Sequence, residues 1–146
     1  MVIKLGIKLS IKLGMTRNRD GISEEAQYTF QEFLNNTEIV EVHHGDCVGA
    51  DKIFHDICKT NNLKIIIHPP SNDSLRAFCE SEFILEPDEY LERNKAIVDS
   101  TDMLIAFPST QFEMIRSGTW QTIRYARKLK KKILIIYPNG EKLNEN

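Results

Sequence analysis

The chain is poor in cysteine, has no excess of charge of one sign and lacks any long apolar run. Its three cysteines, Cys47, Cys58 and Cys79, are an odd number without a Cys-x-x-Cys pair. Free thiols in a reducing compartment fit this pattern better than a disulfide or zinc framework does. We therefore expect an intracellular, cytoplasmic protein without a bound metal.

The charge balance and the lack of long apolar runs limit the kinds of partner that we expect. The 19 Lys and Arg residues are offset by 21 Asp and Glu residues, which gives a net charge of -2. Non-specific binding to nucleic acid depends on many contacts between basic side chains and phosphates, so nucleic acid is not expected as a primary partner. No apolar run approaches the roughly 18 residues that a membrane span needs. The N-terminus also lacks the apolar block and cleavage site of a secretion signal, so we expect a soluble protein with no membrane partner.

The N-terminal segment is repetitive. The unit Ile-Lys-Leu-Gly or Ile-Lys-Leu-Ser occurs three times between residues 3 and 14, with apolar and polar residues in strict alternation. A period of two is typical of a strand with one buried face, although a repeated unit offers several registers. We expect 11–15 to be the first core strand. Residues 1–10 are then a β-prone extension that either pairs with another subunit or stays mobile.

The rest of the chain alternates between strand and helix patterns. The expected strands are 39–42, 63–67, 103–107 and 133–137, and the expected helices are 23–35, 50–61, 88–100 and 117–131. No period is convincing in 71–87, which predicts a functional loop such as a lid or an element that the pattern does not reveal. The order predicts one α/β domain over 11–140, followed by a C-terminal tail at 141–146. Its architecture is Rossmann-like and doubly wound, with a mainly parallel open sheet and helices on both faces.

Two junctions between a strand and a helix contain the small residues that a phosphate site needs. One is the block from His44 to Asp51, which includes Gly45 and Gly49, and the other leads from Pro108 to Thr119. A helix N-terminus presents unpaired N–H groups and a partial positive charge, and glycines there let an anion approach the backbone. Ligands of open α/β sheets bind beyond the carboxyl ends of the strands. We expect the two bends to converge on one cleft that binds a nucleotide.

Several ordered motifs resemble the SLOG superfamily of Rossmann-like nucleotide-binding domains. They are Arg93-Asn94-Lys95, the stretch from Asp102 to Pro108, and Ser117-Gly118-Thr119. The superfamily includes the "lonely guy" phosphoribohydrolases, once labelled lysine decarboxylases, and the DNA-processing protein A group. The resemblance covers about 11–140, and the blocks 44–51, 90–94 and 116–120 point to a branch of small single-domain proteins. It implies nucleotide binding and assembly into a homodimer or higher homo-oligomer.

The resemblance also bears on catalysis. The phosphoribohydrolases have an arginine nine residues before the aspartate that opens the strand, and Arg93 stands in that relation to Asp102. Their Pro-Gly-Gly-x-Gly-Thr-x-x-Glu signature ends in a glutamate that assists N-glycosidic cleavage, but Thr122 holds that position here. A carboxylate is the usual stabiliser of the oxocarbenium-like state. The resemblance thus supports binding more than hydrolysis, and Arg93, His44 and Asp46 are the candidate catalytic residues if the protein is an enzyme.

Each candidate also has a purely structural explanation. Glycines suit any tight turn, Asp51 complements a helix dipole, and Ser117 can cap a helix without a ligand. Against this, Asp46 on a turn can accept ribose hydroxyls, and Arg116 at a helix N-terminus pairs naturally with phosphate. His44 is either a ligand contact or proton shuttle, or a core histidine.

The predicted ligand-binding residues all lie at strand ends or helix starts. They are Thr16, Arg17, His44, Gly45, Asp46, Gly49, Ala50, Asp51, His68, Arg93, Asn94, Pro108, Arg116, Ser117, Gly118, Thr119 and Thr122. We expect them to bind a nucleotide or nucleotide-derived ligand, such as an ADP-ribose-like or cyclic-nucleotide-like molecule, for sensing or sequestration and without a cofactor. Two other functions stay open: an N-glycosidic phosphoribohydrolase with a rearranged site, and an oligomerisation scaffold without ligand.

Overall fold

The structure is a computed structural model that describes residues 10–146, so the predicted N-terminal extension lies outside it except for Ser10. The helices are α1 (Glu24–Asn36), α2 (Ala50–Thr60), α3 (Tyr90–Asp99) and α4 (Gly118–Lys128), with a short 3-10 helix η1 (Asp73–Leu75). The strands are β1 (Ile11–Arg17), β2 (Ile39–His44), β3 (Lys64–Ile67), β4 (Phe83–Ile84), β5 (Met103–Phe107), β6 (Lys132–Ile136) and β7 (Lys142–Glu145). Each predicted helix and strand is present, with its ends shifted by a few residues at most.

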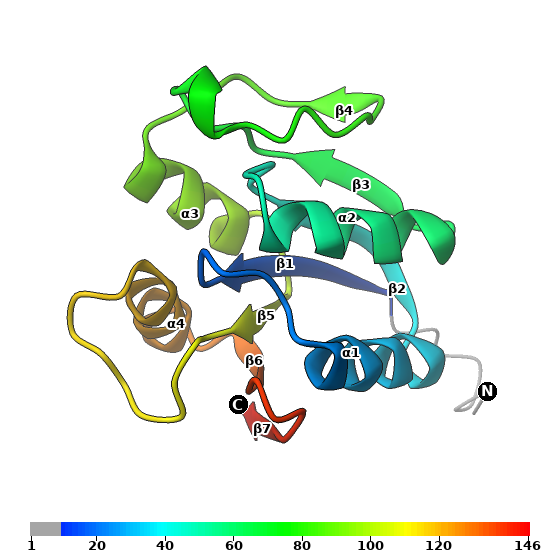
Figure 1. Ribbon diagram of the computed structural model, residues 1–146, viewed down its shortest axis with the longest axis vertical. Coiled ribbons are helices and arrows are strands. Elements are labelled where there is room, and N and C mark those ends of the chain that lie inside the picture. Colours follow the sequence, from blue (N-terminus) through cyan, green and yellow to red (C-terminus); the bar gives the residue numbers. More distant parts are fainter. Residues whose placement is uncertain (1–9) are drawn as a thin grey trace.

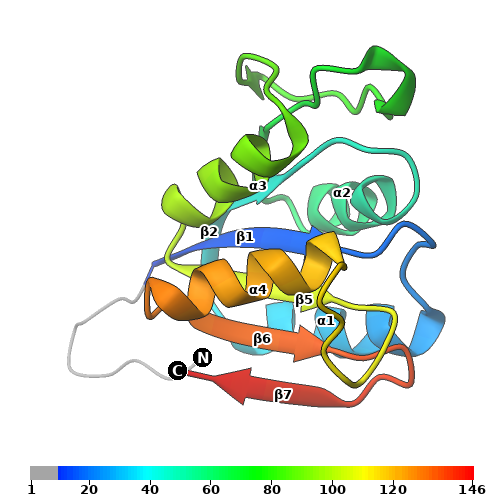
Figure 2. The same cartoon turned by 90° about the vertical axis from the view of Figure 1, so that its left-hand side faces the viewer.

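The seven strands form one sheet in the order β4-β3-β2-β1-β5-β6-β7. All neighbours run parallel except β6 and β7, which are antiparallel, as the opposed arrows in Figure 2 show. Helices α1 and α2 cover one face of the sheet, and α3 and α4 cover the other (Figure 1). The predicted fold class, a single-domain Rossmann-like α/β sheet, is confirmed. None of the helices within 10–146 is both long and apolar enough to cross a bilayer.

Two serines start helices as the sequence predicts. The Ser23 hydroxyl accepts a hydrogen bond from the Ala26 N–H at 3.1 Å, and Glu24 and Glu25 complement the positive end of α1. The Ser117 hydroxyl accepts one from the Trp120 N–H at 3.3 Å. A side-chain oxygen in this position pairs one of the N–H groups that the first helical turn leaves without an acceptor. Both helix starts are thereby set by local sequence.

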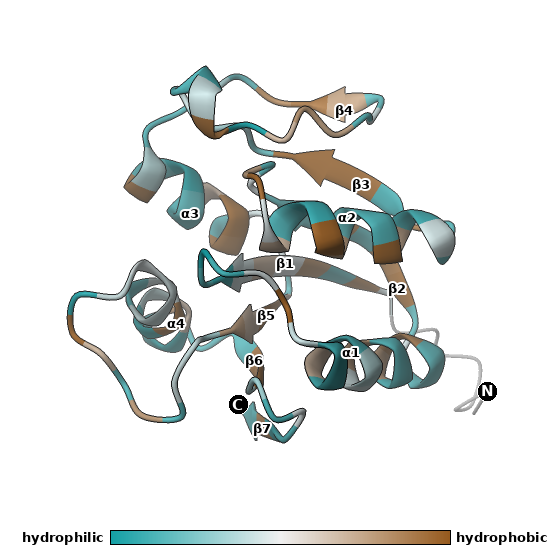
Figure 3. Cartoon of the chain, viewed as in Figure 1, coloured by the Kyte–Doolittle hydropathy of each residue, from teal (hydrophilic) through white to brown (hydrophobic). Residues whose placement is uncertain are grey.

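The core has two parts because side chains of a strand alternate between the faces of the sheet. On the side of α1 and α2, Phe30 and Phe54 stack with ring centroids 5.1 Å apart, and Phe107 packs edge-on against Phe30. On the side of α3 and α4, Leu104 packs with Trp120 and other apolar side chains of α4. Every residue of β5 is buried, as expected for an apolar strand covered on both faces. Figure 3 shows β3 in brown and the helices with brown bands between teal ones, as expected for helices with one apolar face.

The prediction of a C-terminal tail at 141–146 is wrong. Residues of β7 pair with β6, from Ile136 with Lys142 to Ile133 with Glu145. The Arg127 guanidinium holds the end of this strand through two bonds to the Glu145 carboxylate, at 2.7 and 2.8 Å. The segment 71–87, in which no period is apparent, contains η1 and the two-residue strand β4 within a long irregular connection.

Candidate functional site

The carboxyl ends of β1 and β5 form the place where the sheet changes its winding direction. The connection after β1 leads to α1 on one face, whereas the connection after β5 leads to α4 on the other. Arg17 and Phe107 face each other there, and the Phe107 carbonyl accepts bonds from the Asn18 N–H and side-chain amide at 3.0 and 2.8 Å. A crevice at such a switch point is the usual ligand site of an open α/β sheet.

A small cavity lies beside this switch point. Its lining residues come from β1, the turn after β2, α2 and α3; they are Met15, Thr16, Arg17, Gly45, Asp51, Arg93, Asn94 and Ile97. Six of them, Thr16, Arg17, Gly45, Asp51, Arg93 and Asn94, were predicted to contact a ligand. The cavity measures about 10 Å³, which is room for about one water molecule. The structure therefore gathers the predicted residues but leaves little open space between them.

Arg17 and Asp51 form an ion pair in the wall of this cavity. Arg17 Nη2 lies 3.3 Å from Asp51 Oδ2, and both side chains are largely buried. Burial is the largest single effect and disfavours the charged guanidinium, but Asp51, Cys47 and Tyr90 together outweigh it and raise the pKa of Arg17. Asp51 Oδ2 also accepts the Cys47 N–H at 2.9 Å. The cavity thus has a permanently charged cation whose counter-ion belongs to the protein.

Arg93 is only 2% exposed and crosses from α3 to the ends of two strands. Its Nη1 donates to the Gly45 carbonyl at 2.7 Å and to the His68 carbonyl at 3.5 Å, while Nε donates to the Asn94 side chain at 2.9 Å. A Cβ added at Gly45 would lie 2.3 Å from Arg93 Nη1. Glycine is required at this position because the guanidinium packs directly on the backbone.

The second bend is also filled by a side chain. A Cβ added at Gly118, the first residue of α4, would lie 2.1 Å from the Tyr90 hydroxyl. Tyr90 begins α3, is 41% exposed, and has its ring 5.4 Å from the Arg93 guanidinium carbon. The prediction of one open cleft between the two bends is therefore wrong, since Arg93 occupies the first bend and Tyr90 the second.

Asp46 does not reach the cavity, and its predicted ribose contact is corrected. Its fully buried carboxylate accepts bonds at 2.9 Å from Arg76 Nε and Nη2 and from the Cys79 N–H. Its backbone has a φ of 55°, which aspartate tolerates better than most residues. Asp46 therefore fastens the segment 76–79 against the turn after β2.

The histidines at the strand ends pair with one another inside the protein. His44 Nδ1 accepts the Asp46 N–H and its Nε2 lies 2.9 Å from His55 Nδ1. His43 lies between Glu41, at 2.6 Å, and His68, at 2.8 Å. Burial lowers the pKa of both His44 and His68 to about 4, so both rings are neutral at pH 7. The predicted ligand contacts of His44 and His68 are corrected to core hydrogen bonds.

One group of side chains has the composition of a metal site. His44, His55 and Cys79 are buried, with one ligand atom of each within 4.8 Å of the others. A backbone N–H can only donate, so His44 Nδ1 is the acceptor and its Nε2 holds the ring proton, which it donates to His55. Burial also raises the pKa of the Cys79 thiol to about 12. With this hydrogen-bond arrangement His44 has no free lone pair, so the three side chains form a hydrogen-bonded part of the core.

The other predicted residues lie at the starts of α2 and α4, within α4 or after β5, and none of them lines the cavity. Gly49 caps α2 with a φ of 93° and no side-chain cap, and Ala50 behind it is buried. Arg116 is exposed, and the Thr122 hydroxyl donates to the Gly118 carbonyl at 2.9 Å. Pro108 and Thr119 are buried.

Three residues around the site, Tyr90, Arg76 and Cys47, have no predicted ligand role. Tyr90 belongs to the block 90–94, but nothing in the sequence shows that its hydroxyl reaches α4. Arg76 lies in the segment without a period, thirty residues from the aspartate that it pairs with. A cysteine in the site, Cys47, has its Sγ 3.7 Å from Arg93 Nη1.

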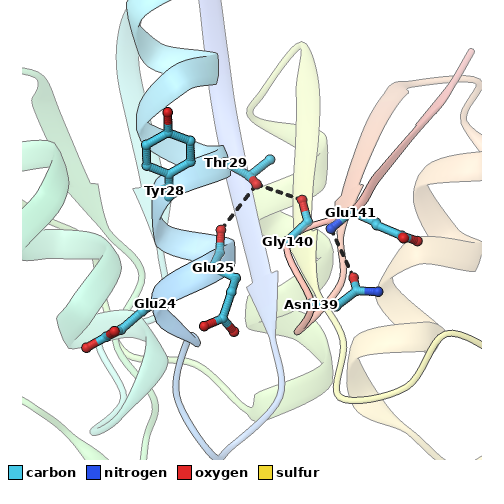
Figure 4. Close-up of a pocket in the computed structure, with 7 residues that line it drawn as sticks. All are labelled: Glu24, Glu25, Tyr28, Thr29, Asn139, Gly140 and Glu141. Atoms are coloured by element: carbon cyan, nitrogen blue, oxygen red, sulfur yellow. Dashed lines mark hydrogen bonds between the residues drawn. The ribbon is translucent and has the colours of Figure 1, made fainter.

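A larger hollow of about 510 Å³ opens elsewhere, between the start of α1 and the turn that joins β6 to β7 (Figure 4). Its lining residues are Glu24, Glu25, Tyr28, Thr29, Asn139, Gly140 and Glu141. The Thr29 hydroxyl donates to the Gly140 carbonyl at 2.6 Å and fixes the turn to the helix. This hollow contains three carboxylates and no cationic side chain, so it disfavours an anion, and no predicted ligand-binding residue lines it.

Comparison of the sequence with protein-family models and with curated proteins, and of the structure with solved structures, finds no match. The functional argument for this chain therefore depends on its own residues and geometry.

Proposed function

We propose that the protein binds a nucleotide or a nucleotide-derived anion at the switch point between β1 and β5. The observation that carries this proposal is the convergence of Thr16, Arg17, Gly45, Asp51, Arg93 and Asn94 on one cavity at that point. These residues come from parts of the chain far apart in sequence, yet they meet where open α/β sheets bind their ligands.

The charges around the cavity favour an anion. Two guanidiniums, of Arg17 and Arg93, face one carboxylate, of Asp51. The uncapped N-terminus of α2 and the N-terminus of α4 add partial positive charge at the same edge of the sheet. The motif resemblance to nucleotide-binding domains supports the same class of ligand.

A ligand needs more room than the cavity offers, and Tyr90 is the side chain that can make it. Its ring is partly in solvent, whereas Arg93 is buried and held by two carbonyls. Rotation of Tyr90 away from Gly118 would free the space next to the first residue of α4. Binding is therefore coupled to a change of one exposed rotamer, which the protein makes at small cost.

Binding has more support than cleavage. The position of the hydrolytic glutamate is occupied by Thr122, whose hydroxyl is engaged by the Gly118 carbonyl. Arg93, the first catalytic candidate, donates to protein carbonyls, and Asp46 and His44 are engaged inside the core. A neutral threonine does not stabilise the positive charge that develops on the ribose.

A thermal-shift screen tests this proposal with nucleoside mono- and diphosphates, ADP-ribose and cyclic nucleotides. A ligand at a hundred times its Kd stabilises the protein by about 2.7 kcal/mol, or roughly 5–10 °C for a chain of this size. Arg17→Gln should abolish the shift, measured from the variant's own melting temperature. Arg19→Gln, an exposed arginine two residues away, is the matched control.

Mass analysis of the denatured protein after purification complements the screen by detecting a ligand that co-purifies. The proposal fails if no nucleotide raises the melting temperature and none co-purifies. A shift that survives in Arg17→Gln would show that a nucleotide binds somewhere other than this cavity.

A further inference from the structure

The sheet edge at β4 exposes apolar side chains to solvent. Within residues 10–146, β4 is the last strand on its side and pairs only with β3. Phe83, Ile84 and Leu85 are 40%, 49% and 46% exposed, and the Leu85 N–H donates to the Ile67 carbonyl at 2.9 Å, which extends the pairing. Figure 3 shows β4 in brown with teal connections on either side. An edge strand of this kind is a template on which another strand can add.

Carboxylates surround these apolar residues. From Glu80 to Glu92 the chain has six acidic residues and no lysine or arginine. Glu82 and Glu86 bracket the three apolar residues, and both are exposed. Residues 82–86 therefore consist of three apolar residues with a negatively charged residue at each end.

The N-terminal repeat contains a block of matching length and opposite charge. Lys4-Leu5-Gly6-Ile7-Lys8 has two lysines four residues apart, the same spacing as Glu82 and Glu86. In a strand, residues two and four apart share a face. One register therefore places both lysines opposite both glutamates, and puts Leu5 and Ile7 opposite Phe83 and Leu85, in either strand direction.

We propose that residues 4–8 of one copy add as a strand to the β4 edge of a second copy, and that two copies exchange these segments to form a homodimer. Opposite charges facing each other across a strand pair are favourable, as are contacts between apolar side chains. Because each copy offers both a segment and an edge, the exchange closes into a symmetric pair.

The segment cannot reach this edge within its own chain. β1 begins at Ile11, and a strand added outside β4 would lie four strand positions from β1. At about 4.8 Å per position this is roughly 19 Å. Only Leu9 and Ser10 separate the block from β1, so Lys8 and Ile11 are three residue steps apart and can be separated by at most about 11 Å. The block on a given β4 edge must therefore come from another copy.

The opposite edge of the sheet does not suit the same segment. β7 forms that edge, and its residues carry both signs of charge, with exposed Lys142 between Glu141 and Glu145. The Glu145 carboxylate is already paired with Arg127, and an incoming lysine would also meet Lys142. The segment 80–92, by contrast, has no lysine or arginine to repel the incoming lysines, which favours β4 over β7.

Light scattering and sedimentation of the full chain over a range of concentrations test the proposal. The wild type should have twice the 16.9 kDa mass of one chain. Lys4→Glu with Lys8→Glu, and separately Glu82→Lys with Glu86→Lys, should each raise the dimer dissociation constant at least tenfold. An equimolar mixture of the two double variants should restore the dimer, because every segment then faces an edge of opposite charge.

Lys128→Glu with Lys132→Glu is the matched control and should leave the dimer unchanged. Circular dichroism and melting temperature check that each variant is folded, since all the substituted residues that the structure describes are exposed. A monomeric wild type overturns the proposal, as expected if the carboxylates only protect a free edge. A dimer insensitive to both charge reversals, or a mixture that stays monomeric, overturns it equally.

Discussion

Gly45→Ala is the substitution that most directly tests how the site is held together. The new Cβ would lie 2.3 Å from Arg93 Nη1 and 2.6 Å from its Cζ. The guanidinium cannot retreat easily, because it is buried and bonded to the Gly45 carbonyl and to Asn94. Alanine at this position must therefore displace Arg93 or the turn after β2.

The size of the effect follows from two contributions. Overpacking a well-filled interior costs about 1–3 kcal/mol, and losing a hydrogen bond to a charged group costs about 1.5–3 kcal/mol. Together they lower the free energy of unfolding by about 3–5 kcal/mol. In a chain of this length that is a fall in melting temperature of roughly 10 °C.

Gly118→Ala provides a matched comparison. Its Cβ would lie 2.1 Å from the Tyr90 hydroxyl, an apparently worse clash. Tyr90 is partly exposed and can turn into solvent, and alanine suits the first turn of a helix better than glycine does. We expect a change of about 1 kcal/mol or less. Urea denaturation measures both variants, and equal losses at the two positions would refute the assigned role of Arg93.

Three further predictions concern acid stability, the 76–79 segment and the last strand. Burial lowers the pKa of His44 and His68 to about 4 from the usual value near 6.5, so the neutral rings stabilise the fold above pH 6.5 and this contribution is lost as the pH falls toward 4. Lowering the pH from roughly 7.5 to 5 should reduce the free energy of unfolding by about 2 kcal/mol for each histidine. His44→Gln should weaken this pH dependence in urea denaturation, and an unchanged dependence would show that only carboxylates cause the acid loss. Asp46→Ala leaves Arg76 and the Cys79 N–H unpaired and should lower the free energy of unfolding by about 3 kcal/mol, with faster proteolysis after Arg76. The exposed control variant Asp73→Ala should match the wild type. Equal proteolysis of Asp46→Ala and the wild type would contradict the anchoring role of Asp46. Arg127→Gln should speed amide exchange in β7 while changing global stability by about 1 kcal/mol or less, and unchanged exchange there would show that the β6 pairing alone holds the strand.

The fold could be predicted where one local pattern was decisive. The apolar run of β5 and the cap residues Ser23 and Ser117 each depend on near neighbours in the chain. β7 could not be predicted because Lys-Leu-Asn-Glu has no apolar period. Its structure comes from backbone pairing with β6, between residues 6 to 12 positions apart, and from the ion pair of Arg127 with Glu145, which are 18 positions apart.

The sequence predicted where the candidate site lies, but not that Arg93 and Tyr90 fill its two bends. The bends at 44–51 and 116–120 do lie at the carboxyl edge of the sheet, because strand order alone brings them there. Whether a bend binds a ligand or a side chain depends on distant residues, such as Arg93, which is 48 positions from Gly45. A glycine leaves room for a guanidinium as well as for a phosphate, so a ligand-binding turn and a turn filled by the protein's own side chain have the same sequence pattern.

Arg17 and Arg93 differ in how readily they can serve a ligand, and this difference makes Arg17 the better mutational target. Arg93 donates to two backbone carbonyls at buried strand ends, and the other donor to the Gly45 carbonyl is the weaker Cys47 thiol at 3.7 Å. Arg17 instead faces the Asp51 carboxylate at 3.3 Å, and Asp51 keeps its bond from the Cys47 N–H if Arg17 turns away. An incoming phosphate can therefore take the place of Asp51 as the counter-ion, while Asp51 keeps the Cys47 N–H and its favourable position in the first turn of α2. Exchange of one anion for another at Arg17 is the step on which ligand affinity at this edge should depend.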